Sequence, residues 1–175
     1  MWSHFARRVR FPRFSFARRG IRWTGYGGRN GAETGTLPER LALTRDDSER
    51  AVREFYRAYA EQDGEALMRM IAPDEVLHVS GRHGLSGAYR GVEEIFGYIG
   101  KVGAWTGGLG GFEVDAVMTD EDGHAAAIVT GTAIHEGETF TRQLVHLFTF
   151  RDDQTVEFRD LPFDQHAEDE FWPSA

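Results

Sequence analysis

The sequence predicts a single α+β domain over residues 44–175, in which helices come first and antiparallel strands follow. Apolar residues recur at helical spacing between residues 44 and 102, whereas the segments after residue 112 are apolar runs separated by short polar turns. This order indicates the α+β class, because a βαβ fold would alternate helices and strands. The length of 175 residues suits one domain with a sizeable core.

Three helices are predicted in the first part of this domain. Thr44-Arg45-Asp46-Asp47 has the pattern of a capping box, and the apolar spacing after it predicts an amphipathic helix of about 17 residues. Asp63 can cap a second, short helix, and Pro73 is expected to end it because proline lacks a backbone donor. A third helix is predicted after Gly91, with apolar residues on one side: Ile95, Phe96, Ile99 and Val102.

The remaining elements are predicted to be strands. The first covers residues 75–80, and a turn-rich connection at residues 81–91 follows it. From Phe112 onward only strands and turns are expected, since turn residues such as Asp122-Gly123 separate the apolar runs. These strands are predicted at residues 112–118, 125–134, 140–150 and 155–163.

The composition excludes several classes of site. The chain has no cysteine, which excludes disulfides, thiolate nucleophiles and cysteine-ligated zinc. Seven histidines are present without a His-Glu-x-x-His pattern, so we expect neither a metal nor a cofactor. The net charge of -8 argues against nucleic-acid binding by the main domain. No apolar run is long enough to span a membrane, and we expect a cytoplasmic protein.

Residues 1–43 differ from the rest of the chain. They combine arginines, aromatic residues and a glycine-rich stretch at residues 25–31, and residues 1–30 contain no Asp or Glu. No helical or strand period persists there, so we expect a flexible basic and aromatic N-terminal extension. Two interpretations stay open: an arm that contacts nucleic acid or an anionic membrane surface, and an extension without function or from a start codon assigned too far upstream.

Strand alternation predicts which polar residues face a common pocket. In the last strand Asp160 shares a face with Phe158, and Asp164 continues the same parity. In the neighbouring strand His146 shares a face with apolar residues, and His78 lies on the first strand. A carboxylate and an imidazole in an apolar pocket suit general acid/base chemistry. The candidate catalytic residues are therefore Asp164, Asp160, His78 and His146.

Aromatic residues supply the candidate ligand contacts. Tyr56, Tyr59, Trp105, Phe148 and Phe158 are the residues that we expect to contact a small apolar molecule. Each candidate also has a structural interpretation. The aspartates can cap turns or pair with arginine, the histidines and tyrosines can be core residues, and Trp105 can seal a dimer.

Several short segments resemble the SnoaL-like polyketide cyclase and ketosteroid isomerase group of the nuclear transport factor 2-like superfamily. They are Phe55-Tyr56-Arg57-Ala58-Tyr59, Ala66-Leu67-Met68 with Ala72-Pro73-Asp74, His78-Val79-Ser80-Gly81, Gly87-Ala88-Tyr89-Arg90-Gly91, Val145-His146-Leu147-Phe148 and Asp164-Gln165-His166. This resemblance implies a cone-shaped (cystatin-like) fold, with three N-terminal helices packed on a strongly curved, mostly antiparallel sheet and a pocket between them. It also implies a homodimer. It does not imply a reaction, because the fold hosts enzymes of several kinds and non-enzymes.

The resemblance also bears on the catalytic residues. The family's cyclases use an aspartate near the end of the last strand, which corresponds best to Asp164 and next to Asp160. The tyrosine and the two acids of ketosteroid isomerases correspond to Phe55, Val79 and His146, so steroid isomerisation of that type is not expected. We expect a cofactor-independent cyclase, isomerase or hydratase acting on a small apolar molecule. The alternative is a non-catalytic ligand-binding or dimerisation domain of the same fold.

Overall fold

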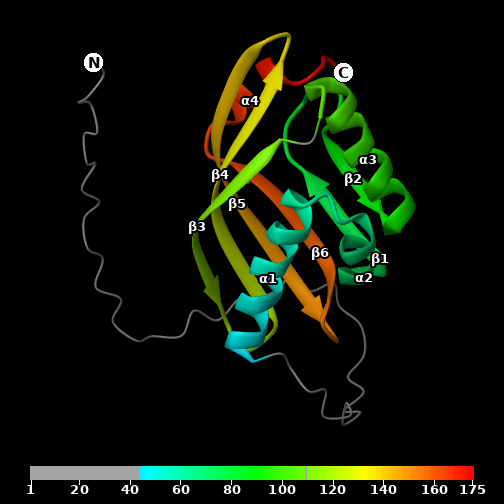
Figure 1. Ribbon diagram of the computed structural model, residues 1–175, viewed down its shortest axis with the longest axis vertical. Helices are drawn as coiled ribbons and strands as arrows, with labels where there is room; N and C mark the ends of the chain where they lie inside the picture. The colour runs from blue at the N-terminus through cyan, green and yellow to red at the C-terminus, as the bar shows by residue number, and fades with distance from the viewer. Residues whose placement is uncertain (1–43, 109) are drawn as a thin grey trace, which may run out of the picture. The chain divides into compact units, whose positions relative to one another are not determined.

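A computed structural model describes residues 44–108 and 110–175 (Figure 1). The predicted extension at residues 1–43 lies outside the described residues. The elements are, in chain order, α1 (Arg45–Ala60), α2 (Gly64–Met70), β1 (Ile71–Val79), β2 (Gly87–Arg90), α3 (Gly91–Thr106), β3 (Gly111–Thr119), β4 (His124–His135), β5 (Glu138–Arg151), β6 (Gln154–Pro162) and α4 (Gln165–Phe171). Helices followed by strands confirm the predicted α+β class. No helix in these two described segments is both long and apolar enough to cross a bilayer.

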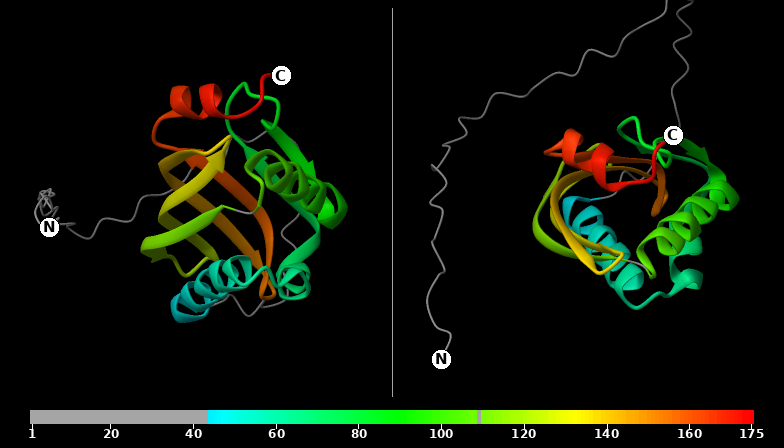
Figure 2. Two further views of the ribbon diagram at one scale, coloured as in Figure 1. Left: turned by 45° about the horizontal axis from the view of Figure 1, so that its top comes forward. Right: turned by 90° about the horizontal axis from the view of Figure 1, so that it is seen from above.

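The six strands form one curved sheet in the order β2-β1-β6-β5-β4-β3. Every neighbouring pair is antiparallel except β1 and β6, which run parallel. Helix α1 packs on β3 and β4, and α3 packs on β1 and β2. Figure 2 shows the sheet curving around these helices, while α4 covers one end of it.

Two predicted helix starts are confirmed by their caps. The Thr44 side chain accepts a hydrogen bond from the backbone of Asp47, whose carboxylate accepts one from the Thr44 backbone in return. The Asp63 side chain accepts a hydrogen bond from the Ala66 backbone at the start of α2. Such caps satisfy backbone donors that have no partner within the helix.

The second helix ends before Pro73, as expected, but the first strand begins earlier than the predicted residue 75. Helix α2 ends at Met70, and β1 begins at the next residue and includes Pro73. The pairing of β1 with β6 shifts register between Ile71 and Val76, and pairing with β2 begins only at Val76. Pro73 therefore lies where no ladder bond requires its missing N–H group, which is where a strand tolerates proline.

The prediction of only strands and turns after Phe112 was wrong. The seven-residue helix α4 follows β6, and Asp164 caps it by accepting hydrogen bonds from the backbones of His166 and Ala167. A helix of two turns is too short to establish a readable apolar period. The four-residue strand β2, within the predicted turn-rich connection, was missed for a similar reason.

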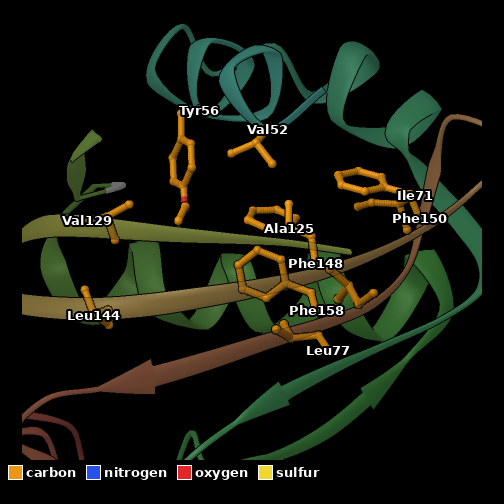
Figure 3. Close-up of a cluster of buried hydrophobic side chains, with 12 residues drawn as sticks. Val52, Tyr56, Ile71, Leu77, Ala125, Val129, Leu144, Phe148, Phe150 and Phe158 are labelled. Carbon is orange, nitrogen blue, oxygen red and sulfur yellow. The ribbon is translucent and has the colours of Figure 1, made fainter. Parts of the chain in front are cut away.

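The main core lies between α1 and the inner face of the sheet. Figure 3 shows Val52 and Tyr56 pointing from α1 toward the strands that carry Phe148 and Phe158. Val52 and Phe148 are at most 1% exposed, so α1 is fixed firmly against the sheet. This packing sets the position of Tyr56 on the inner side of α1.

Candidate active site

A mostly apolar pocket lies between the inner face of the sheet and helices α1, α2 and α3. Its volume is about 80 Å³, whereas a buried water molecule needs roughly 10–15 Å³. Apolar side chains such as Phe55, Leu77 and Ile95 form most of its lining. The polar and ionisable side chains that reach it are Tyr59, Glu75, Tyr98, Arg142, His146 and Asp160. A concave apolar site with a few polar groups is the usual form of a small-molecule site.

Strand pairing brings His146 and Asp160 together. They are directly opposite each other in the antiparallel ladder of β5 and β6. His146 Nε2 lies 3.8 Å from Asp160 Oδ2, which is too long for a hydrogen bond but close for two ionisable groups. The side chains are only 3% and 13% exposed. The sheet register thus fixes an imidazole and a carboxyl group side by side in the pocket.

The other nitrogen of His146 is held by helix α1. Tyr56 Oη lies 2.6 Å from His146 Nδ1, and the two rings are stacked with an interplanar angle of 10°. Burial, followed by the positive charge of Arg142, lowers the pKa of His146 to about 3. Burial and then the charge of Asp160 raise the pKa of Tyr56, so its hydroxyl keeps its proton. A neutral imidazole therefore meets a protonated phenol.

This arrangement favours one tautomer of His146. If Tyr56 donates its proton to Nδ1, the imidazole hydrogen resides on Nε2 and faces Asp160. An ionised Asp160 stabilises that tautomer electrostatically. Nε2 is buried and has no hydrogen-bond partner within residues 44–108 and 110–175. The site therefore offers a hydrogen-bond donor that the described part of the protein leaves unused.

Asp160 contributes a buried carboxyl group to the pocket from the inner face of β6. Burial raises its pKa, while the charges of Arg142 and His83 oppose that effect. A carboxyl group with a raised pKa is a stronger base when ionised and holds a proton closer to neutral pH. Such a group can both accept and return a proton.

Arg142 connects the pocket to helix α4. Its guanidinium forms a buried ion pair with Glu168, at 2.6 Å, and lies over the ring of Trp172. The Trp172 indole also donates to Glu168 at 2.5 Å. These contacts tie α4 across the end of the sheet and hold the positive charge of Arg142 beside Asp160. Removing a partner from such a pair leaves an uncompensated buried charge.

The four predicted catalytic residues do not lie together. Asp160 and His146 line the pocket, whereas Asp164 is exposed and caps α4. His78 is outside the pocket lining and lies 3.2 Å from the carboxylate of Glu157, with about a third of each side chain exposed. Of the four, only Asp160 and His146 can therefore meet the same pocket ligand in this arrangement.

The predicted ligand contacts also separate into groups. Tyr59 and Phe158 line the pocket, and Tyr56 lies behind His146 as its hydrogen-bond partner. Phe148 is 1% exposed and belongs to the core. Trp105 is outside the pocket lining and stacks on His135, with ring centroids 3.8 Å apart.

Sequence reasoning missed Glu75 as a pocket residue. Glu75 is 3% exposed and shares the inner face of β1 with Leu77, and both line the pocket. Its alternation with Leu77 was a usable signal, because residues two apart on a strand share a face. Tyr98 on α3 was missed as well, although it follows Ile95 at helical spacing.

The carboxyl groups of the pocket come from separate strands, Glu75 from β1 and Asp160 from β6. No group of three His, Asp or Glu side chains within residues 44–108 and 110–175 is arranged to hold a metal ion.

Comparison with known proteins identifies the family. Residues 52–158 match the family described as the SnoaL-like domain, and this match covers more than half of the chain. The protein therefore belongs to the SnoaL-like family, as predicted. An uncharacterized protein of Mycobacterium tuberculosis is 26% identical over 130 residues, which cover 74% of this chain and 99% of that protein.

Solved structures confirm the predicted fold. Bal32a, from a soil-derived mobile gene cassette, has a TM-score of 0.70 and 27% identity, over 73% of this chain and 98% of Bal32a. A protein with a cystatin-like fold from Xanthomonas campestris has a TM-score of 0.67 and 26% identity, over 72% of this chain and 98% of that one. The domain thus has the nuclear transport factor 2-like, or cystatin-like, fold.

Proposed function

We propose that this protein is an acid/base enzyme of the cyclase, isomerase or hydratase type that acts on a small, largely apolar molecule. Asp160 is the catalytic acid/base in this proposal. The observation that carries it is the placement of Asp160 opposite His146 in a mostly apolar pocket. A buried carboxyl group with a raised pKa is suited to move a proton between atoms of one bound molecule.

The residues around Asp160 have separate roles in this proposal. The ionised carboxylate removes a proton from the ligand, and the resulting carboxylic acid returns it at the same or another atom. His146 stays neutral and donates from Nε2 to an oxygen on which negative charge develops. Tyr56 holds the imidazole in that tautomer through Nδ1. The positive charge of Arg142 opposes the rise in the pKa of Asp160 and so favours its carboxylate form.

A non-natural substrate that reacts when a base removes its proton tests the proposal before any natural substrate is known. Nitrobenzisoxazole is small and aromatic. When a base removes the proton from its ring carbon, the N–O bond breaks and a coloured cyanonitrophenolate forms. We expect the wild-type protein to accelerate this elimination, and we expect Asp160→Asn to lose that rate by at least about a hundredfold. The assay measures the absorbance of cyanonitrophenolate over time, at probe concentrations above and below saturation.

Asp164→Asn is the matched control. It makes the same chemical change at an exposed position, and asparagine also caps a helix well. It should leave the elimination rate unchanged. Equal rates for wild type and Asp160→Asn would sink the catalytic proposal and favour a ligand-binding domain without catalysis. A loss confined to Asp164→Asn would place the base outside the pocket.

A further inference from the structure

A second carboxyl group reaches the pocket away from Asp160. Glu75 lies four residues before Val79 on β1, and Val79 is paired in register with Asp160. At about 3.3 Å per residue, the backbone positions of Glu75 and Asp160 are offset by roughly 13 Å along the strand direction. Apolar side chains such as Leu77 and Phe158 lie on the inner face between these two levels of the sheet. The pocket is therefore apolar in its middle and polar at two separate places.

The hydrogen bonds of Glu75 run through a threonine. Thr155 Oγ1 lies 2.5 Å from Glu75 Oε2 and 3.0 Å from the carbonyl oxygen of Met70. A hydroxyl group has only one proton to donate. If Glu75 is protonated, it donates to Thr155, which donates in turn to Met70, and all three groups are satisfied. If Glu75 is ionised, the single hydroxyl proton of Thr155 can go to only one of two acceptors, Glu75 Oε2 or the Met70 carbonyl oxygen.

The second carboxyl oxygen of Glu75, Oε1, differs from Oε2 in its hydrogen bonding. No hydrogen bond reaches Oε1 from any residue that the structure describes, although Glu75 is only 3% exposed. Burial raises the pKa of Glu75 to about 7, while the hydrogen bond from Thr155 opposes this effect. In the protonated form that donates through Oε2, Oε1 is a carbonyl oxygen, and in the ionised form it is a carboxylate oxygen. Both forms leave an acceptor available to a ligand.

We propose that Glu75 and Thr155 form a polar subsite that accepts a hydrogen bond from a hydroxyl group on the far end of the ligand. The proposal rests on the proposed function, because it assigns one end of the molecule that Asp160 acts on. A hydroxyl group fits better than an ammonium group. An ammonium group would require an ionised Glu75, the form that burial disfavours, and the pocket-lining Leu67, Ile71 and Ile95 are apolar. The substrate class is a small apolar alcohol or phenol.

Two substitutions test whether Glu75 acts as a hydrogen-bond acceptor or as a negative charge. Glu75→Gln keeps an oxygen toward the pocket, and its amide can donate to Thr155 as the protonated carboxyl group does. Glu75→Met has similar length and no acceptor. The probes are toluene, benzyl alcohol and benzylamine, and their dissociation constants are measured by ligand-detected NMR on the full chain. Toluene binding also reports whether each variant retains a folded pocket.

The measured quantity is the ratio of the dissociation constant of benzyl alcohol to that of toluene. We expect Glu75→Met to raise this ratio about tenfold and Glu75→Gln to leave it close to the wild-type ratio. An unchanged ratio in Glu75→Met would overturn the subsite. So would a preference for benzylamine that both variants lose, because that pattern indicates a site for a cation.

The test also distinguishes this proposal from the proposed function. An unchanged ratio together with intact, Asp160-dependent elimination of nitrobenzisoxazole would overturn the subsite alone. If wild type binds none of the three probes and does not accelerate the elimination, both proposals fail.

Discussion

His146 and Asp160 are paired across strands β5 and β6, with Nε2 3.8 Å from Oδ2. Because the pairing comes from the backbone ladder, neither side chain depends on a loop for its position. Nε2 has no hydrogen-bond partner within the described parts of the chain, and leaving a buried polar atom unpaired costs about 1–3 kcal/mol. A ligand oxygen that accepts from Nε2 recovers that free energy, so the same feature that destabilises the free protein favours binding.

Substituting Tyr56 with phenylalanine tests the support of His146 from α1. The change removes the hydroxyl that contacts Nδ1 at 2.6 Å and leaves a buried ring nitrogen without its partner. We expect Tyr56→Phe to lower the free energy of unfolding by about 1–2 kcal/mol, measured by urea denaturation. Tyr59→Phe is the matched control, because the Tyr59 hydroxyl makes no hydrogen bond to any described residue. Equal losses in the two variants would argue against the role of the Tyr56 hydroxyl.

The protonation state of His146 is directly measurable. Burial lowers its pKa to about 3, so its ring should stay neutral from about pH 5 to about pH 8. Long-range proton–nitrogen NMR should show a single tautomer with the hydrogen on Nε2. Since the folded pKa lies below the unfolded value of 6.5, the stability that His146 contributes is present above pH 6.5 and is lost as pH falls toward 3. A ring that titrates near pH 6.5 would contradict its assigned neutral role.

The contribution of Glu75 to stability depends on pH in the opposite direction to that of His146. Its pKa is about 7 in the folded protein against 4.5 as the ordinary value, so its contribution is fully present below pH 4.5 and declines as pH rises to 7. The shift corresponds to roughly 3 kcal/mol. Glu75→Gln mimics the protonated form, and its advantage in unfolding free energy over wild type should grow by that amount between these pH values. A constant difference across the range would show that Glu75 is ionised at little cost.

Arg142 is predicted to act on both stability and the pKa of Asp160. Arg142→Met leaves Glu168 buried without its partner and should cost about 3–5 kcal/mol in unfolding free energy. Adding Glu168→Met should recover part of this loss, because the unpaired charge is removed. If the double variant folds, its pH–rate profile for the nitrobenzisoxazole elimination should shift to higher pH, since Arg142 lowers the pKa of Asp160. A profile that does not move would contradict the electrostatic role.

The fold was predictable from the sequence because its signals are local. The Thr44 capping box and the Asp63 cap marked the starts of α1 and α2 correctly. Alternation along β5 and β6 correctly placed His146 and Asp160 with the inward apolar residues. The start of β1 was placed too late, at residue 75 instead of Ile71, because an unpaired strand position tolerates proline.

The site was only partly predictable, because alternation defines two faces without telling which one is covered. On β1, His78 and Glu75 lie on opposite faces, and the packing of α3 against this strand makes the face of Glu75 the inner one. The sequence favoured His78 for its chemistry alone. Asp164 was chosen from the family resemblance and by extending the parity of β6, but the strand ends at Pro162 and the chain turns into α4. Parity cannot be extended past the end of a strand.

The role of Asp160 as the base is tested most sharply by comparing the titration of its carboxyl group with the pH dependence of catalysis. Carbon-detected NMR of isotope-labelled aspartate, assigned with Asp160→Asn, reports the pKa of this carboxyl group. The nitrobenzisoxazole elimination reports the pKa of the group that acts as base. If Asp160 is the base, the two pKa values coincide and lie above the ordinary value of 3.8. If the rate follows a different pKa, or persists in Asp160→Asn, Asp160 is not the base.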